Sequence, residues 1–111
     1  MKITDVRTFI VTPKARNAGV IGKKNWLFVR VETDEGIHGW GEAYTQLARD
    51  KNMEELVREI GKYLIGRDPF NIKHFVGMIY DDFASRRGSM DLYCALSGIE
   101  QSMWDIIGKK L

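Results

Sequence analysis

The first third of the chain alternates apolar and polar residues with a period of two, which is the spacing of a half-buried β-strand. Residues 3–11 are rich in Val, Ile, Thr and Phe and predict a first strand. Residues 25–33 predict a second strand, in which Leu27, Val29 and Val31 alternate with bulkier or charged side chains. We therefore expect these three aliphatic residues to share the buried face of a sheet.

A turn and a third strand follow directly. Residues 34–36, with the sequence Asp-Glu-Gly, are typical of a hairpin turn because glycine tolerates a positive φ angle. Residues 37–43 then predict a third strand, antiparallel to the second. Its small residues Gly39, Gly41 and Ala43 fall on one face, which indicates that another element packs closely against them.

The rest of the chain changes to helical spacing, with apolar residues at intervals of three and four. The first predicted helix begins at the capping-box sequence Asn52–Glu55 and ends at Gly66. The second begins with Asp68 as its N-cap residue and Pro69 in its first turn. A third helix follows a break at residues 85–89. The apolar stripes are Met53, Leu56, Val57, Ile60 and Leu64, then Ile72, Phe75, Val76, Ile79 and Phe83, then Leu92, Leu96, Ile99, Met103 and Ile106.

Strands followed by helices predict an α+β fold, here a three-stranded antiparallel meander followed by a three-helix bundle. The length of 111 residues suits one domain. The fractions of hydrophobic and charged residues, 44% and 29%, are usual for a globular domain and agree with that fold. The net charge is only +2, with acids and bases mixed along the chain, whereas a nucleic-acid-binding surface needs a denser basic face. We therefore expect no nucleic-acid partner.

Cysteine use and hydropathy bear on the cellular location. Cys94 is the only cysteine, so no internal disulfide can form, and its apolar neighbours favour a small buried residue over a nucleophile. The N-terminal segment lacks the apolar run of a signal peptide. No apolar stretch approaches the roughly 20 residues that span a bilayer. We expect a cytoplasmic protein with no membrane partner.

Residue types that commonly carry chemistry are present but scattered. His38 and His74 lie on different predicted elements and have no partners at metal-ligand spacing. The adjacent helical carboxylates of Asp81–Asp82 point apart, and Glu54–Glu55 suits the positive end of a helix dipole. Glu42 closes the GWGE motif near the end of the third strand and is interpreted as a hydrogen-bond partner, because an isolated carboxylate is a poor indicator of catalysis. The sequence predicts no catalytic residue and no metal ligand within these 111 residues.

Three stretches resemble a known family: NWLFVRVETDEGIHGWGEAY at 25–44, LIGRDPFNI at 64–72 and RRGSMDLYCALSGIEQSMWDIIGKKL at 86–111. In this order and spacing they resemble the N-terminal capping domain of the mandelate racemase and muconate lactonizing branch of the enolase superfamily, over essentially the whole chain. Within that branch they are most similar to the acid-sugar dehydratases of gluconate and galactonate type. Ser89 and Glu100 stand where the family often has Pro and Asp, and they leave the subgroup open.

The resemblance implies a two-part enzyme, of which residues 1–111 are the enolase-like N-terminal capping domain. A (β/α)7β barrel is expected after residue 111 in the same polypeptide, as the partner of this domain and the carrier of the active site. There, a Lys or His base removes the proton α to a substrate carboxylate, and Mg²⁺ stabilises the resulting enediolate. Magnesium is thus expected on the barrel and not on these residues. The family also implies a homo-oligomer.

In this family, two loops of the capping domain fold over the barrel mouth and set substrate specificity. The matching stretches here are 14–25 and 44–50. Their cations suit the carboxylate of a sugar acid, their amide and hydroxyl groups suit its hydroxyls, and an indole ring can wall off the pocket. The candidate substrate-binding residues are Arg16, Asn17, Lys23, Lys24, Trp26, Tyr44, Thr45 and Gln46.

The leading hypothesis is a substrate-specificity lid of a magnesium-dependent enzyme that dehydrates a sugar acid. A racemase, an epimerase or a cycloisomerase on the same scaffold is an alternative within enzymes. An alternative of another class is a non-catalytic, truncated α+β interaction module. The lid hypothesis predicts an exposed apolar face where the barrel docks.

Overall fold

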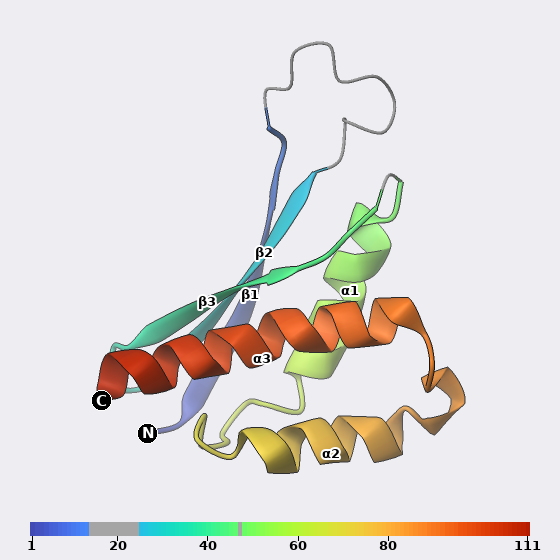
Figure 1. Ribbon diagram of the computed structural model, residues 1–111. Helices are drawn as coiled ribbons and strands as arrows, with labels where there is room; N and C mark the ends of the chain where they lie inside the picture. Colours follow the sequence, from blue (N-terminus) through green and yellow to red (C-terminus); the bar gives the residue numbers. More distant parts are fainter. Residues whose placement is uncertain (14–24, 47) are drawn as a thin grey trace.

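A computed structural model describes residues 1–13, 25–46 and 48–111 of the chain, and within them three strands form one antiparallel sheet (Figure 1). Strand β1 spans Ile3–Val11, β2 spans Trp26–Thr33 and β3 spans His38–Ala43. Their spatial order is β1-β2-β3, a simple meander. The meander predicted from the sequence is therefore confirmed.

The sheet has one buried face, and the period-two pattern identifies it. Leu27, Val29 and Val31 of β2 are fully buried, whereas the residues between them are partly exposed. The strand register places Thr8 and Gly41 on either side of Val29, so these residues share the buried face. The prediction for the aliphatic set is confirmed.

Three helices follow the sheet within the described residues: α1 spans Asp50–Gly61, α2 spans Ile72–Asp82 and α3 spans Met90–Lys110. A short 3-10 helix, η2, spans Ala84–Arg86 between the last two. In Figure 1, α3 crosses the sheet, and α2 runs antiparallel beside α3. The expected α+β order of strands followed by helices is confirmed.

Helix α3 approaches β3 unusually closely, because glycines line their contact. A Cβ atom at Gly39 would overlap the backbone carbonyl oxygen of Ser102, and one at Gly41 would overlap that of Gly98. Ser102 is fully buried, and its hydroxyl donates to the Gly98 carbonyl oxygen at 3.0 Å. The close packing expected from the small residues of the third strand is present, and the packed element is α3.

Helix α3 also covers the free edge of β3. The backbone N–H of Trp40 donates to Asp105 at 2.9 Å, and that of Glu42 donates to Gln101 at 3.0 Å. The Gln101 amide returns a hydrogen bond to the Glu42 carbonyl at 3.3 Å. These side chains satisfy strand groups that would otherwise be open to pairing with another chain.

The predicted limits of the first helix are wrong at both ends. Helix α1 begins at Asp50, with Arg49 as its N-cap residue, and its cap lacks a side-chain hydrogen bond among the described residues. It ends at Gly61 and not at Gly66. The backbone N–H of Gly66 instead donates to the Ile3 carbonyl at 2.8 Å. This pairing with the first residue of β1 draws the chain out of the helix before Gly66.

The predicted start of the second helix is also wrong. Asp68 accepts a hydrogen bond from the backbone N–H of Phe70 at 2.9 Å, which closes a turn that contains Pro69. Helix α2 begins only at Ile72, with Asn71 as its N-cap residue. The Asp-Pro pair starts a turn here because the Asp68 side chain binds a backbone amide two residues ahead.

Candidate functional site

The loop between β3 and α1 carries the described part of the predicted substrate-binding set. Tyr44 is 48% exposed and Gln46 is exposed, whereas Thr45 between them is 2% exposed. The β2–β3 register pairs Leu27 with Ala43, so Trp26 and Tyr44, the next residues outward, lie at the same end of the sheet. The structure therefore brings Trp26, Tyr44 and Thr45 to one end of the molecule.

The hydroxyl of Thr45 points to Asp50 and not to solvent. Its Oγ1 donates to Oδ1 of Asp50 at 3.0 Å, and Nδ2 of Asn25 donates to Oδ2 of the same carboxylate at 2.7 Å. Sequence reasoning missed Asp50 and Asn25. Their proximity depends on the strand register, so the sequence offers no local signal for it.

The same loop is also fixed to α3. The guanidinium of Arg49 lies 2.7 Å from the carboxylate of Asp91, and the backbone N–H of Arg49 donates to the Gln46 carbonyl at 3.0 Å. Ala48 has a φ angle of 65°, a left-handed conformation that non-glycine residues seldom adopt. These contacts connect the described loop residues Gln46, Ala48 and Arg49 to one another and to α3.

Of the remaining predicted substrate-binding residues, Trp26 alone belongs to the part of the chain that the structure describes. Trp26 is 40% exposed on the sheet face away from the helices, and its ring stacks on Phe28 with a centroid separation of 6.3 Å. The other predicted residues lie outside the described residues, in the segment 14–24. They are Arg16, Asn17, Lys23 and Lys24.

A cavity of about 410 Å³ lies between the end of β3 and the first half of α3. Glu42 and Tyr44 line it on the strand side. Cys94 lines it from α3, and burial, followed by the nearby charge of Asp91, raises the pKa of its thiol. Cys94 is only half-buried, because its side chain borders this cavity, so the full burial predicted from the sequence is wrong. A thiol with a raised pKa is a poor nucleophile at neutral pH.

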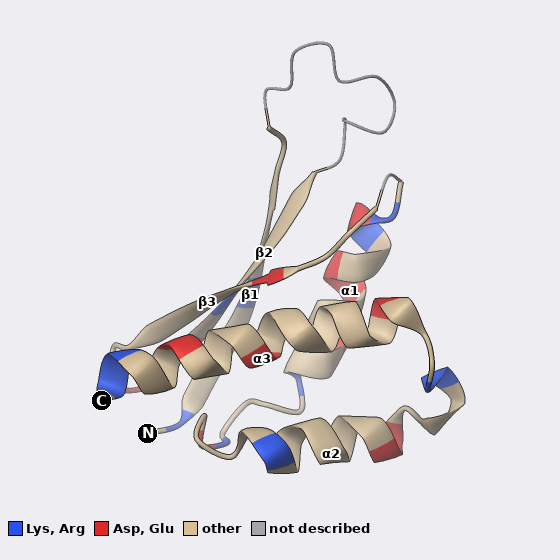
Figure 2. Cartoon of the chain, in the orientation of Figure 1, with Lys and Arg blue, Asp and Glu red and all other residues tan. Residues whose placement is uncertain are grey.

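Charged residues of both signs are interspersed along the helices, as Figure 2 shows. Among the described residues, no group of three or more His, Cys, Asp or Glu side chains is placed to hold a metal ion. His38 lies on β3 and His74 on α2. Asp81 pairs with Arg87 at 3.5 Å. The acidic residues of the described part therefore do not fit a magnesium site.

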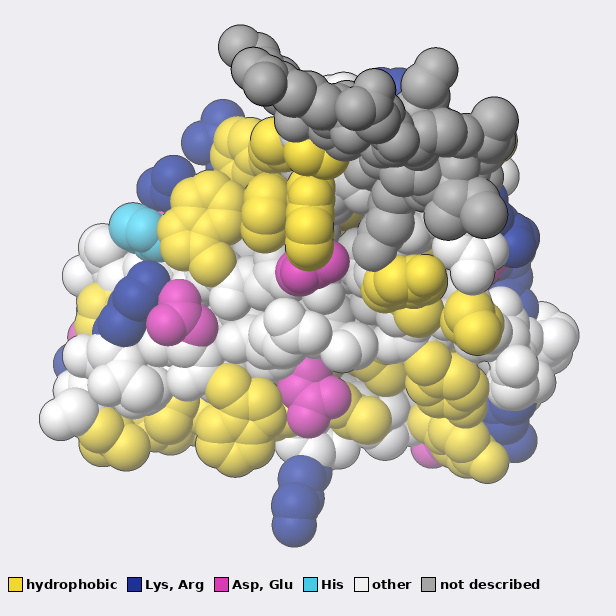
Figure 3. Space-filling model, turned by 45° about the horizontal axis from the view of Figure 1, so that its top comes forward, with side chains coloured by type: hydrophobic (Ala, Val, Ile, Leu, Met, Phe, Trp, Pro, Cys, Tyr) yellow, Lys and Arg dark blue, Asp and Glu magenta, His cyan; other side chains and the backbone are white. Residues whose placement is uncertain are grey.

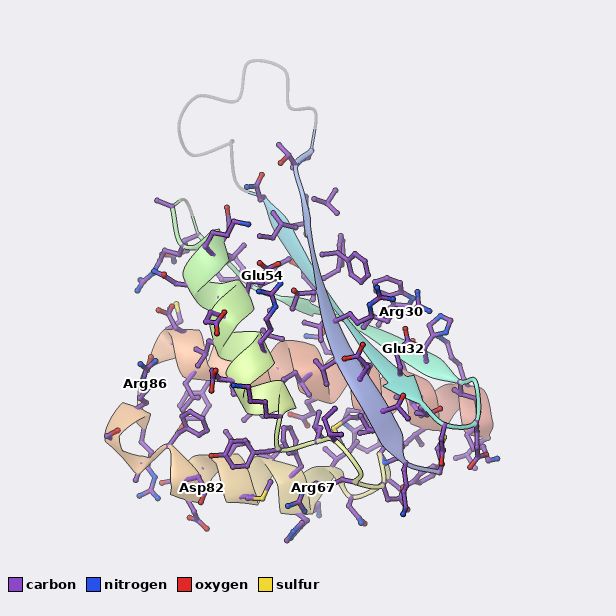
Figure 4. All side chains as sticks on the ribbon, turned by 180° about the vertical axis from the view of Figure 1, so that it is seen from behind. Arg30, Glu32, Glu54, Arg67, Asp82 and Arg86 are labelled. Carbon is purple, nitrogen blue, oxygen red and sulfur yellow. The ribbon has the colours of Figure 1, made fainter. Side chains whose placement is uncertain are left out.

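Glu54 has a different role from the one predicted. It is 9% exposed and accepts a hydrogen bond from the Thr8 hydroxyl at 2.9 Å. Arg58 lies 3.3 Å from the same carboxylate. Figure 4 shows Glu54 on the side of α1 that faces the strands. Glu54 lies beyond the first turn of α1, so it fastens α1 to β1 instead of complementing the helix dipole.

Large hydrophobic side chains remain exposed on the outer sides of α2 and α3. Met90, Tyr80 and Trp104 are 63%, 47% and 58% exposed. A groove of about 480 Å³ runs between the two helices, with Tyr80 on one wall and Trp104 on the other. Figure 3 shows hydrophobic side chains gathered in several groups on the face in view. Exposed apolar surface is therefore present on this side of α2 and α3.

Comparison with known proteins assigns the family. The family model described as "Mandelate racemase / muconate lactonizing enzyme, N-terminal domain" matches residues 1–111. The chain belongs to this family. As a member of the mandelate racemase and muconate lactonizing enzyme family, it contributes the N-terminal domain, and the resemblance noted from its three motifs is confirmed.

Curated relatives and a solved structure support the assignment. The chain is 39% identical to a D-galactonate dehydratase from Cronobacter sakazakii and 40% identical to one from Variovorax paradoxus, in each case over all 111 residues. The crystal structure of a mandelate racemase/muconate lactonizing enzyme from Sulfitobacter sp. matches 99% of the chain with a TM-score of 0.86 and 30% identity.

The chain spans 26% of the length of both curated relatives and 27% of the solved structure. About three-quarters of each relative therefore lies outside the matched part. Within the described residues, no helix is both long enough and apolar enough to cross a membrane.

Proposed function

We propose that this chain is the substrate-specificity lid of a magnesium-dependent enzyme that dehydrates a sugar acid. The observation that carries the proposal is the identity of 39% and 40%, over the entire chain, to two proteins named D-galactonate dehydratase. Residues 1–111 form the capping domain, and a (β/α)7β barrel follows residue 111 in the same polypeptide. The unmatched three-quarters of each relative leaves ample length for such a barrel.

The lid binds the substrate and excludes water from the reaction. Tyr44 and Gln46 project from the β3–α1 loop, and Trp26 lies at the same end of the sheet. We assign the carboxylate of the sugar acid to Arg16, Lys23 and Lys24, because cations bind carboxylates through charge-assisted hydrogen bonds. Asn17 and Tyr44 bind the hydroxyl groups of the sugar.

The barrel supplies the chemical step. A base removes the proton from the carbon α to the substrate carboxylate, the β-hydroxyl leaves as water, and the resulting enol becomes a 2-keto-3-deoxy acid. We place the magnesium ion on the barrel, as the resemblance to the family implies. The complete enzyme is proposed to be a cytoplasmic homo-oligomer, which cell fractionation and light scattering would examine.

The experiment is an assay of the complete polypeptide on a panel of sugar acids that begins with D-galactonate. We expect a 2-keto-3-deoxy product, detected with a carbonyl reagent, and loss of turnover when a chelator removes magnesium. An epimerised acid without keto product would favour a racemase or epimerase. A cyclised isomer would favour a cycloisomerase, and a polypeptide without a barrel or turnover would favour a binding module.

A further inference from the structure

Asp50 lies where the sheet end, the β3–α1 loop and helix α1 meet. Each oxygen of its carboxylate accepts one hydrogen bond: Oδ2 from Asn25 at 2.7 Å and Oδ1 from Thr45 at 3.0 Å. Asn25 immediately precedes β2, Thr45 follows β3 by two residues, and Asp50 is the first residue of α1. One side chain therefore ties together three elements that meet at this end of the sheet.

We propose that Asp50 is a positioning residue that orients Tyr44 and Gln46 toward the substrate. Its carboxylate holds Thr45 inward, and because side chains alternate along an extended segment, the residues on either side turn outward. The burial pattern agrees: Thr45 is 2% exposed, Tyr44 is 48% exposed and Gln46 is exposed. The inference rests on the proposed function for its statement that this loop contacts substrate.

The negative charge of Asp50 strengthens the hydrogen bonds that hold Thr45 and Asn25. Hydrogen bonds to an ionised carboxylate are roughly twice as strong as those between neutral groups. A carboxylate in the first turn of a helix is further stabilised by the positive end of the helix dipole. Since Asp50 is half-buried, its two bonds are also partly shielded from competing water. These two hydrogen bonds to Asp50, here called the Asp50 clamp, therefore hold residues 44–46 in place before substrate binds, which reduces the ordering that binding requires.

The effect of losing the clamp should be local. The other end of the loop is fixed independently, by the pairing of Arg49 with Asp91 on α3 at 2.7 Å. The start of α1 is held by the Met53 N–H, which donates to the Arg49 carbonyl at 2.9 Å. Removing the Asp50 carboxylate thus frees Thr45 and Asn25 but leaves α1 and the Arg49 contact in place.

The test compares Asp50→Ala with Asp82→Ala in the complete polypeptide. Asp82 is exposed at the end of α2, and its side chain points away from the rest of the molecule (Figure 4), so it controls for loss of an aspartate. We expect hydrogen exchange of the amides at 44–46 to become about tenfold faster or more in Asp50→Ala only. Exchange in β2 should stay unchanged. The KM for the sugar acid should rise about tenfold, with a smaller change in kcat.

A second pair of variants tests the hydrogen bond between Thr45 and Asp50 by changing the donor, Thr45. Thr45→Val removes the donor at nearly constant volume and should behave as Asp50→Ala does, whereas Thr45→Ser keeps the hydroxyl and should behave as the parent. If exchange at 44–46 in Asp50→Ala equals that of Asp82→Ala, the clamp is refuted.

Two further outcomes would also overturn the inference. General loss of protection in both Asp50→Ala and Thr45→Val would show that the contact maintains the fold. Faster exchange with an unchanged KM would show that the loop does not position substrate. If no sugar acid is turned over, the proposed function fails, while the exchange data still decide whether Asp50 holds the loop.

Discussion

At Gly41, the absence of a side chain sets the separation between β3 and α3. A Cβ atom there would overlap the Gly98 carbonyl oxygen and lie 2.9 Å from the Ser102 hydroxyl oxygen. The first neighbour is helix backbone, and the second is fully buried, so neither can move aside easily. We expect Gly41→Ala to lower the free energy of unfolding by about 3 kcal/mol, as overpacked cores do, measured by urea denaturation.

Gly77 provides the matched control. It lies in α2, and a Cβ atom there would have no neighbour within 4 Å. Gly77→Ala should raise the free energy of unfolding by up to about 1 kcal/mol, because alanine favours helix more than glycine does. A Gly41→Ala protein as stable as the parent would contradict the close approach of α3.

Between elements, the contact of Thr8 with Glu54 fastens α1 to β1. Thr8→Val removes a donor from a carboxylate that is 9% exposed, while Arg58 at 3.3 Å still offsets its charge. We expect a loss of about 1–3 kcal/mol in unfolding free energy, the usual penalty for an unsatisfied buried group. Thr8→Ser keeps the donor and should lose much less. Equal stabilities of the valine and serine variants, by urea denaturation, would refute this contact.

The C-terminal part of α3 is tied to β3 through Asp105, whose contacts respond to pH. The hydrogen bond from Lys109, and then that from the Trp40 backbone amide, lower the pKa of Asp105 below its ordinary value of 3.8. A lowered pKa in the folded state contributes stability that is present above the unfolded value and is lost as pH falls through the folded value. Asp105→Asn should therefore be less stable than the parent at pH 6, with a difference that shrinks below about pH 4. Urea denaturation across this range measures it, and a constant difference would contradict the assignment.

The elements that follow a regular pattern could be predicted from the sequence. Alternation in β2 identified Leu27, Val29 and Val31 as buried, and all three are fully buried. Helical spacing identified the core residues of α3, such as Ile99 and Met103, which are also fully buried. Burial of apolar area mainly determines which face of a strand or helix packs inward. The spacing of apolar residues in the sequence identifies that face.

The features that depend on distant partners could not be predicted. The end of α1 shifts because the Gly66 N–H pairs with Ile3, which lies far away in the chain. The inward placement of Thr45 depends on Asp50, whose other partner is Asn25, twenty-five residues before it. In both cases the observed structure depends on hydrogen bonds to residues that are distant in the sequence. The local sequence pattern does not indicate these hydrogen bonds.

At the scale of the whole molecule, the shape itself favours a docking role. The principal extents are 45 × 33 × 18 Å, so the molecule is thin in one direction. Its radius of gyration of 14.5 Å exceeds the roughly 13 Å usual for a compact domain of this length. A thin two-layer domain leaves much of its helical surface uncovered. Tyr80 and Trp104, on the walls of the groove between α2 and α3, belong to that surface.

Trp104 is the residue best placed to test that surface as a contact with the proposed barrel. It is 58% exposed, and a tryptophan buried at an interface contributes a large apolar area. We expect Trp104→Lys in the complete polypeptide to loosen the two domains, so that limited proteolysis between them becomes severalfold faster. The fold of residues 1–111 should be unaffected, because the side chain is not part of the core. His74→Lys adds the same charge at an exposed position outside the groove and should leave the cleavage rate unchanged. If both variants are cleaved at the parental rate, the barrel docks on another face. A second uncovered apolar surface among the described residues, the outer side of the sheet around Trp40, then becomes a candidate.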